Sequence, residues 1–199
     1  RNDLVEEFIS YINLNHISLS QTKIKTSIYE TNDFLKKKQP SLIKYSAFFG
    51  SIQIFKFILK NGVKLKQSIW LYAIHGNCPD IIHLLEEENV VIDDNFLKKC
   101  LEESIKCHHN DIAKYLIDKL QYNVDYQLYG IKNYNYEFIT NNFDDKLIFS
   151  QLIILDYFTI INALIHSNSI NAKAFIDYKS IHFAAKKNYH EIVDILLAQ

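Results

Sequence analysis

The sequence predicts an all-α protein in which short helical pairs stack into a solenoid. Segments of about twenty residues repeat along the chain, and Ser41–Leu59 aligns without gaps on Ser68–Glu86 at a shift of 27 residues. Apolar residues recur at helical spacing within each copy. Small residues stand where two helices must approach closely. A helical pair of this size buries its apolar face only against a neighbouring copy, so the copies should stack.

Residues 1–39 precede the repeats and predict an N-terminal helical cap. A helix over residues 3–15 would place one apolar face inward, formed by Leu4, Val5, Phe8, Ile9 and Ile12. A second helix would do the same with Ile24, Ile28 and Leu35. The basic run Lys36–Lys38 leads into Pro40, which marks a boundary because proline disfavours helix in the residue before it. We interpret these lysines as a solvated helix end, with a localisation signal as the alternative.

Residues 40–121 predict three helical pairs, and residues 147–199 predict two more. The first helix of most pairs carries small or apolar residues, namely Ser46-Ala47, Ala73-Ile74, Ser104-Ile105 and Ala184-Ala185. The second helix begins near an acidic or polar residue, which suits the positive end of the helix dipole: Gln53, Asp80, Asp111, Thr159 and Glu191.

Residues 122–146 predict an insertion, because Asp111 and Thr159 are 48 residues apart whereas the other markers are separated by 27 to 32. The segment is rich in aromatic residues: Tyr122, Tyr126, Tyr129, Tyr134, Tyr136, Phe138 and Phe143. We expect these side chains to pack over the array as a long finger or an extra helix. An exposed tyrosine-rich contact surface is the alternative.

The last copy, Lys179–Leu197, reads KSIHFAAKKNYHEIVDILL, and Ser169–Lys173 reads SINAK. These residues resemble the ankyrin repeat, whose pattern is TPLHxAAxxGHxEIVxxLLxxGADVNAK. The segments AIHGNCPDIIHLLEEENV and ESIKCHHNDIAKYL are similar to divergent ankyrin proteins from expanded families of parasitic protists, in which a helical region precedes the repeats. The resemblance implies an ankyrin-repeat solenoid over residues 41–199, with a β-hairpin finger at Ala174–His182.

The resemblance also implies a non-catalytic protein–protein interaction module, a scaffold or adaptor that binds a partner on its concave face and finger tips. The matching positions predict partner contacts at Phe48, His75, Lys106, Phe175, Ile176, Tyr178, Lys186 and Lys187. We expect Phe49 to pack under the cap and Phe48 to be the better contact. A regulatory or targeting region of a larger enzyme is the alternative function.

Cysteine and histidine residues gather in the second and third pairs, at His75, Cys78, His83, Cys107, His108 and His109. Zinc uses such ligands, but packed helices lie about 8–10 Å apart, so we expect few of these side chains to converge. We interpret them as structural and predict no metal, cofactor or catalytic residue. The alternative, a metal-dependent hydrolase or a Cys/His metal-binding protein, predicts stoichiometric zinc.

The composition narrows the remaining function classes. The net charge of −1 disfavours nucleic-acid binding, and four glycines form neither GxGxxG nor GxxxxGK[ST]. No apolar run reaches the ~20 residues that span a bilayer. Three cysteines without a CxxC motif favour a reducing compartment, so we expect an intracellular, cytoplasmic monomer. Because the chain starts at Arg1 and ends just after Leu197, we expect a piece of a longer array.

Overall fold

The computed structural model describes residues 2–25, 27–120, 125–139, 146–166 and 178–198. These residues are mainly helical, which confirms the all-α prediction, and their only strand-like pairing is one antiparallel bridge between Lys23 and Ser41. The chain forms two compact units, residues 1–121 and 122–199. Among the described helices, none has both the length and the apolar character needed to cross a membrane.

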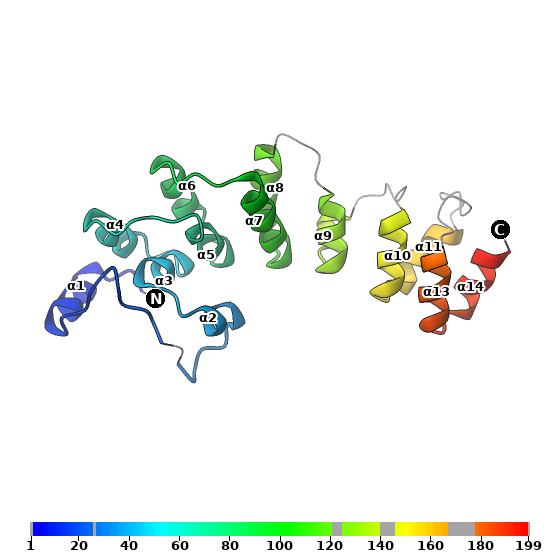
Figure 1. Ribbon diagram of the computed structural model, residues 1–199, viewed down its shortest axis with the longest axis horizontal. Coiled ribbons are helices and arrows are strands. Elements are labelled where there is room, and N and C mark those ends of the chain that lie inside the picture. Colours follow the sequence, from blue (N-terminus) through cyan, green and yellow to red (C-terminus); the bar gives the residue numbers. More distant parts are fainter. Residues whose placement is uncertain (1, 26, 121–124, 140–145, 167–177, 199) are drawn as a thin grey trace. The chain divides into compact units, whose positions relative to one another are not determined.

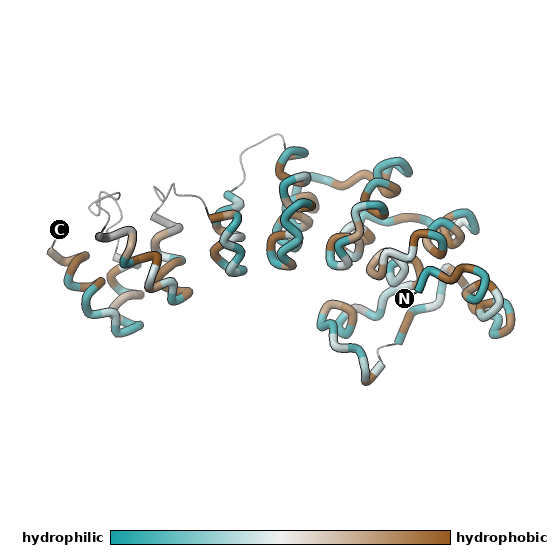
Figure 2. The backbone as a smooth tube through the Cα atoms, turned by 180° about the vertical axis from the view of Figure 1, so that it is seen from behind, coloured by the Kyte–Doolittle hydropathy of each residue, from teal (hydrophilic) through white to brown (hydrophobic). Residues whose placement is uncertain are grey.

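Unit 1 consists of a short N-terminal region followed by three helical pairs (Figure 1). Its helices are α1 (Val5–Leu14), α2 (Asp33–Lys38), α3 (Leu42–Phe48), α4 (Ile52–Lys60), α5 (Ile69–His75), α6 (Pro79–Glu87), α7 (Asp94–Lys106) and α8 (Asn110–Lys119). The first helices stack in sequence, α3 on α5 and α5 on α7, and each packs against its own second helix. Polar and apolar residues alternate along these helices, as an amphipathic stack requires (Figure 2).

The N-terminal region contains the first predicted cap helix, but the second is limited to α2, which includes only Leu35 of the three apolar residues that predicted it. Helix α1 packs on α4, and the Asp3 carboxylate accepts hydrogen bonds from the backbone N–H groups of Gln53 (2.7 Å) and Ile54 (3.0 Å) at the start of α4. These bonds satisfy donors that a helix N-terminus leaves open. Residues 24 and 28 lie outside any helix, and Ile28 is 90% exposed.

Local side-chain bonds explain why the second cap helix is so short. The backbone N–H of Tyr29 donates to Ser27 Oγ, and that of Asn32 donates to Glu30 Oε1. Such bonds offer the backbone an alternative to helix. Asn32 then accepts from the N–H groups of Phe34 (3.0 Å) and Leu35 (3.2 Å), and this cap sets the start of α2.

Unit 2 contains α9 (Tyr126–Lys132), the 3-10 helix η1 (Tyr136–Phe138), α10 (Lys146–Ile154), α11 (Phe158–His166), α13 (Tyr178–Lys186) and α14 (His190–Leu197). Helix α10 packs against α9, α11 and α13, and α13 packs against α14. Its core joins residues from five of these helices, and Ile131, Leu152, Ile161, Ala184 and Ile192 are fully buried in it. The Tyr157 hydroxyl donates to the Ile131 carbonyl oxygen at 2.9 Å.

The same turn ends α3, α5, α7, α9, α10 and α13. After α5, for example, the N–H of Gly76 donates to the carbonyl oxygen four residues earlier. The N–H of Asn77 donates to the carbonyl oxygen three residues earlier, and the N–H of Cys78 to the one five residues earlier. The middle residue of each turn has a positive φ, and these residues are Gly50, Asn77, His108, Tyr134, Asp156 and Asn188. Such a left-handed residue satisfies the last carbonyls of a helix and redirects the chain.

The described part of residues 122–146 contains a further helical pair. Its turn residue, Tyr134, lies 26 residues after His108 and 22 before Asp156. Helix α9 is the first member of the pair and η1 is a shortened second member. A Cβ atom on Gly130 would lie 3.0 Å from the Phe138 Cβ, so glycine allows η1 to approach α9 this closely.

The aromatic side chains of this segment divide between packing and exposure. Phe138 is buried, whereas Tyr134 and Tyr136 are 52% and 64% exposed. The Tyr134 ring nevertheless stacks on Tyr157 at 5.3 Å between centroids. Packing and exposure, the two interpretations left open by the sequence, therefore apply to different residues of one short pair.

The predicted β-hairpin finger is also corrected. Residues 174–177 lie outside the described part of the chain, but Tyr178 is the first residue of α13, which continues to Lys186. The end of the predicted finger is thus helical. Three apolar residues of α13, Ile181, Phe183 and Ala184, pack in or against the core of unit 2. Their burial stabilises α13 and favours helix over the residues that were predicted to end the finger.

Candidate functional site

A hollow of about 400 Å³ lies on the first-helix face of unit 1, between α2, α5 and α7. Its lining combines charged, aromatic and apolar side chains: Asn32, Asp33, Phe34, Lys37, Leu71, His75, Glu103 and Lys106. Two of the predicted contact residues, His75 and Lys106, therefore lie in one place. They belong to neighbouring pairs, and the stacking of α5 on α7 brings them together.

Phe34 fixes one wall of this hollow. The Asn32 side chain caps α2, which begins at Asp33. The Phe34 ring in the first turn of this helix stacks on the His75 imidazole, with 3.8 Å between the two ring centroids. It also meets Tyr72 edge-on at 4.8 Å. Phe34 stands in a segment that the sequence analysis assigned to the cap, and no motif marked it as a site residue.

A polar seam joins α5 to α7 beside the hollow, and we define it as His75, Glu103, Lys106 and Cys107. Oε1 of Glu103 lies 2.6 Å from His75 Nε2 and 3.0 Å from Lys106 Nζ. Sγ of Cys107 lies 3.5 Å from His75 Nδ1. The imidazole is thus placed between a carboxylate and a thiol, and its side chain is only 11% exposed.

The contact between His75 and Glu103 is close, but it is not a straight hydrogen bond. His75 Nε2 is a buried atom that makes no hydrogen bond of acceptable geometry among the described residues. The short separation nevertheless favours the ionised carboxylate, and His75, with help from Lys106, lowers the pKa of Glu103 to about 2 although burial opposes the shift.

The cysteine environments argue against a thiolate nucleophile. Burial raises the pKa of Cys107 to about 11 and that of Cys100 to about 12, with the Glu103 charge adding to both shifts. Burial also raises the pKa of Cys78, whose Sγ lies 3.1 Å from the Gly76 carbonyl oxygen. Because the thiolate is the reactive form, these thiols are poor nucleophiles at neutral pH.

The Cys/His cluster converges only in part. Among these side chains, His75 and Cys107 meet across neighbouring pairs. His109 Nε2 donates to the His75 carbonyl oxygen at 3.3 Å, which is a structural contact. Cys78 instead contacts backbone oxygens, and His83 lies on α6 beside Glu86. Glu103, which the sequence analysis did not select, completes the seam; its position one turn before Cys107 was the available signal.

The remaining predicted contact residues have different environments. Phe48 is only 8% exposed, because Phe34 stacks beside it, so it offers little surface while α2 is in place. This reverses the expected order of Phe48 and Phe49, since Phe49 is only partly buried.

In unit 2, Lys186 and Lys187 are exposed at the end of α13, and Lys187 pairs with Asp156 at 2.8 Å. Phe175 and Ile176 lie outside the described residues, and Tyr178 begins α13.

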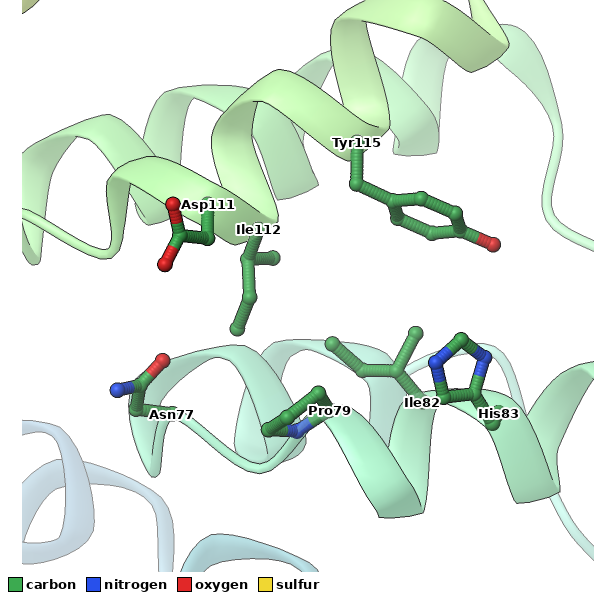
Figure 3. A pocket seen from close by; sticks show the side chains of 7 residues that line it. All are labelled: Asn77, Pro79, Ile82, His83, Asp111, Ile112 and Tyr115. Carbon is green, nitrogen blue, oxygen red and sulfur yellow. The ribbon is translucent and has the colours of Figure 1, made fainter.

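Figure 3 shows a second hollow, of about 360 Å³, between the second helices α6 and α8. Its lining consists of Asn77, Pro79, Ile82, His83, Asp111, Ile112 and Tyr115. At the end where His83 meets the Tyr115 ring, Glu86 accepts hydrogen bonds from Tyr115 and Lys119. These contacts tie α6 to α8, so we interpret this hollow as part of the packing between second helices.

A family described as a domain of unknown function (DUF3447) matches residues 60–141. The match covers α5 to α8 and continues through the short pair α9 and η1. No curated protein and no solved structure matches the chain. The matched residues include the entire seam and the second hollow.

Proposed function

We propose that the chain is a non-catalytic, intracellular protein-interaction module of the divergent ankyrin type. The observation that carries the proposal is the repeated turn, which aligns successive first helices so that residues from neighbouring pairs form one surface. On that surface in unit 1, the hollow bounded by α2, α5 and α7 combines charged, aromatic and apolar side chains. A preorganised surface of this kind binds without a large ordering cost.

The chemistry of the hollow supports recognition rather than turnover. Charged groups of both signs, including Asp33, Lys37 and Lys106, surround the aromatic wall made by Phe34. An aromatic centre with a polar rim is the usual composition of a protein-recognition patch. The buried, protonated thiol of Cys107 does not provide the activated nucleophile that a cysteine enzyme needs.

Affinity capture from the native cell tests this proposal with three charge-reversal variants. We expect Lys106→Glu to lose a partner that the wild-type chain retains, because Lys106 lines the hollow. Lys186→Glu tests the exposed end of α13 in the same way. Lys56→Glu is the matched control, since Lys56 is an exposed lysine on the second helix α4.

Each captured protein would be identified by mass spectrometry, and each variant checked for folding by circular dichroism. Equal capture by the wild type, Lys106→Glu and Lys186→Glu would contradict the proposed contact surface. Capture of no protein above background by the wild-type chain would contradict the proposed function.

A further inference from the structure

The polar seam contains three different metal-ligating groups on two neighbouring helices. His75 belongs to α5, Glu103 lies on α7, and Cys107 follows the last residue of α7. Taking one donor atom from each, the three atoms all lie within 4.8 Å of one another. The stacking of α5 on α7 therefore creates a donor set that neither helix could provide alone.

The donor chemistry favours zinc. A thiolate and an imidazole are ligands that zinc prefers over magnesium or calcium, and a carboxylate completes common zinc sets. Zinc–nitrogen and zinc–sulfur bonds of about 2.0 and 2.3 Å place tetrahedral ligands about 3.5 Å apart. Cys107 Sγ and His75 Nδ1 already have this separation, 3.5 Å. A thiolate and a carboxylate would also balance the charge of a divalent ion.

The surroundings of the seam add two independent features. His75 Nδ1, the nitrogen near Cys107, is the ligand atom, and the other nitrogen, Nε2, is buried without a hydrogen bond of acceptable geometry among the described residues, so no such bond holds the imidazole in its present place. The Phe34 ring covers the imidazole at 3.8 Å, which gives the seam an apolar screen. The hollow beside His75 and Glu103 offers an entry path and room for a water ligand.

We propose that His75, Glu103 and Cys107 form a zinc site that joins the second and third helical pairs of unit 1. Each residue provides one ligand, and water takes the position that faces the hollow. Cys107 binds as the thiolate, so binding of the ion releases the thiol proton to solvent. The Glu103 carboxylate, whose Oε1 now lies 2.6 Å from His75 Nε2 and 3.0 Å from Lys106 Nζ, turns from these two groups toward the metal. The site acts as a cross-link between α5 and α7, and it lies beside the hollow that we propose for partner recognition.

Metal titration of the purified chain tests the site directly, with Co²⁺ as the spectroscopic probe and Zn²⁺ as the competitor. We expect one equivalent of Co²⁺ to give a sulfur-to-cobalt charge-transfer band, and one equivalent of Zn²⁺ to remove it. Cys107→Ser should abolish the band. His75→Gln and Glu103→Gln should each weaken binding by about tenfold or more.

Cys78→Ser is the matched control, because Cys78 is also half-buried at the end of a first helix but contacts backbone oxygens rather than the seam. It should leave the band and the Zn²⁺ affinity unchanged. Far-UV circular dichroism confirms that each variant is folded. Absence of the band in the wild-type chain, a band that survives Cys107→Ser, or equal loss in Cys78→Ser would each overturn the proposal.

Discussion

Unit 1 and unit 2 use the same helix-ending turn but connect neighbouring first helices through different chemistry. In unit 1, the half-buried seam of His75, Glu103, Lys106 and Cys107 lies between α5 and α7. In unit 2, Asp156 after α10 pairs with Lys187 after α13, and this pair is exposed. The backbone geometry is therefore shared, whereas the side chains decide whether the junction is shielded from water.

The small residues of the first helices distinguish one pair of unit 2, α10 and α11, from the pairs of unit 1 and from the other pairs of unit 2. In each of these turns, one backbone N–H donates to the carbonyl oxygen of the residue five positions earlier. In five pairs that acceptor is a small residue, namely Ser46, Ala73, Ser104, Gly130 or Ala184. In α10 the same position is Leu152, which is fully buried. At this position of α10, the Leu152 side chain therefore fills space that a small residue leaves for close approach of helices in the other pairs.

The largest expected effect is that of Leu152→Ala. Although alanine is common at this position in the other pairs, the neighbours of Leu152 have packed around a larger side chain, so truncation leaves a cavity. We expect a loss of about 2–5 kcal/mol in the free energy of unfolding, measured by urea denaturation. Leu101→Ala, which truncates a fully buried leucine in unit 1, should fall in the same range. A neutral Leu152→Ala would show that unit 2 adopts the closer spacing without cost.

Gly76→Ala should have the next largest effect. A Cβ atom there would lie 1.9 Å from the Phe48 carbonyl oxygen, so the backbone of α3 must move. We expect a loss of about 1–3 kcal/mol, as for other overpacked positions. In unit 2 the same turn position holds Asn133, Leu155 or Lys187, which shows that the turn itself accepts a side chain.

Gly62→Ala is the control for that substitution. Its φ of +80° costs alanine conformational energy of about 1 kcal/mol, but no atom lies within 4 Å of the added Cβ. Both variants would be compared by thermal and urea unfolding. If Gly76→Ala were no more destabilised than Gly62→Ala, the close approach of α3 and α5 would not be a constraint.

The charge of Glu103 should make the stability of unit 1 depend on acid pH. Since contact with His75 lowers its pKa in the folded chain to about 2 from an ordinary 4.5, its stabilising contribution is complete above pH 4.5 and is lost as the pH falls toward 2. Glu103→Gln should cost about 1 kcal/mol at neutral pH and flatten this dependence. Urea midpoints of both proteins between pH 6 and pH 3 measure it, and parallel curves would contradict the assignment.

The smallest effect is expected for Asp156→Asn. Hydrogen bonds from Lys187 and Tyr189 lower the pKa of Asp156, but the pair is exposed, and exposed pairs contribute little and are screened by salt. We expect a smaller shift in melting temperature than for Glu103→Gln, and one that disappears at high salt. A larger shift for Asp156→Asn would reverse the comparison between the exposed pair and the seam.

The sequence by itself determined the helical class, the first cap helix and most of the helical pairs. These features depend on local patterns: apolar residues at helical spacing, small residues in the first helices and left-handed turns at Gly50, Asn77 and Asn188. The pair of α9 and η1 escaped detection because its second helix is only three residues long. The sequence signal for this pair is Gly130 followed by the turn Asn133-Tyr134-Asn135. This pattern predicts a helix-ending turn only when it is compared with the turns of the other pairs.

Only the tertiary structure decided which side chains meet. Phe34 covers His75, and Phe48 is buried, because α2 packs onto the first helices from a distant part of the sequence. Glu103 and Cys107 reach His75 because the stacking of α5 on α7 sets the distance between residues about thirty positions apart. Periodicity fixes which face of a helix is inward, whereas contacts across pairs depend on how closely the helices approach, and that distance is set by packing of the whole unit.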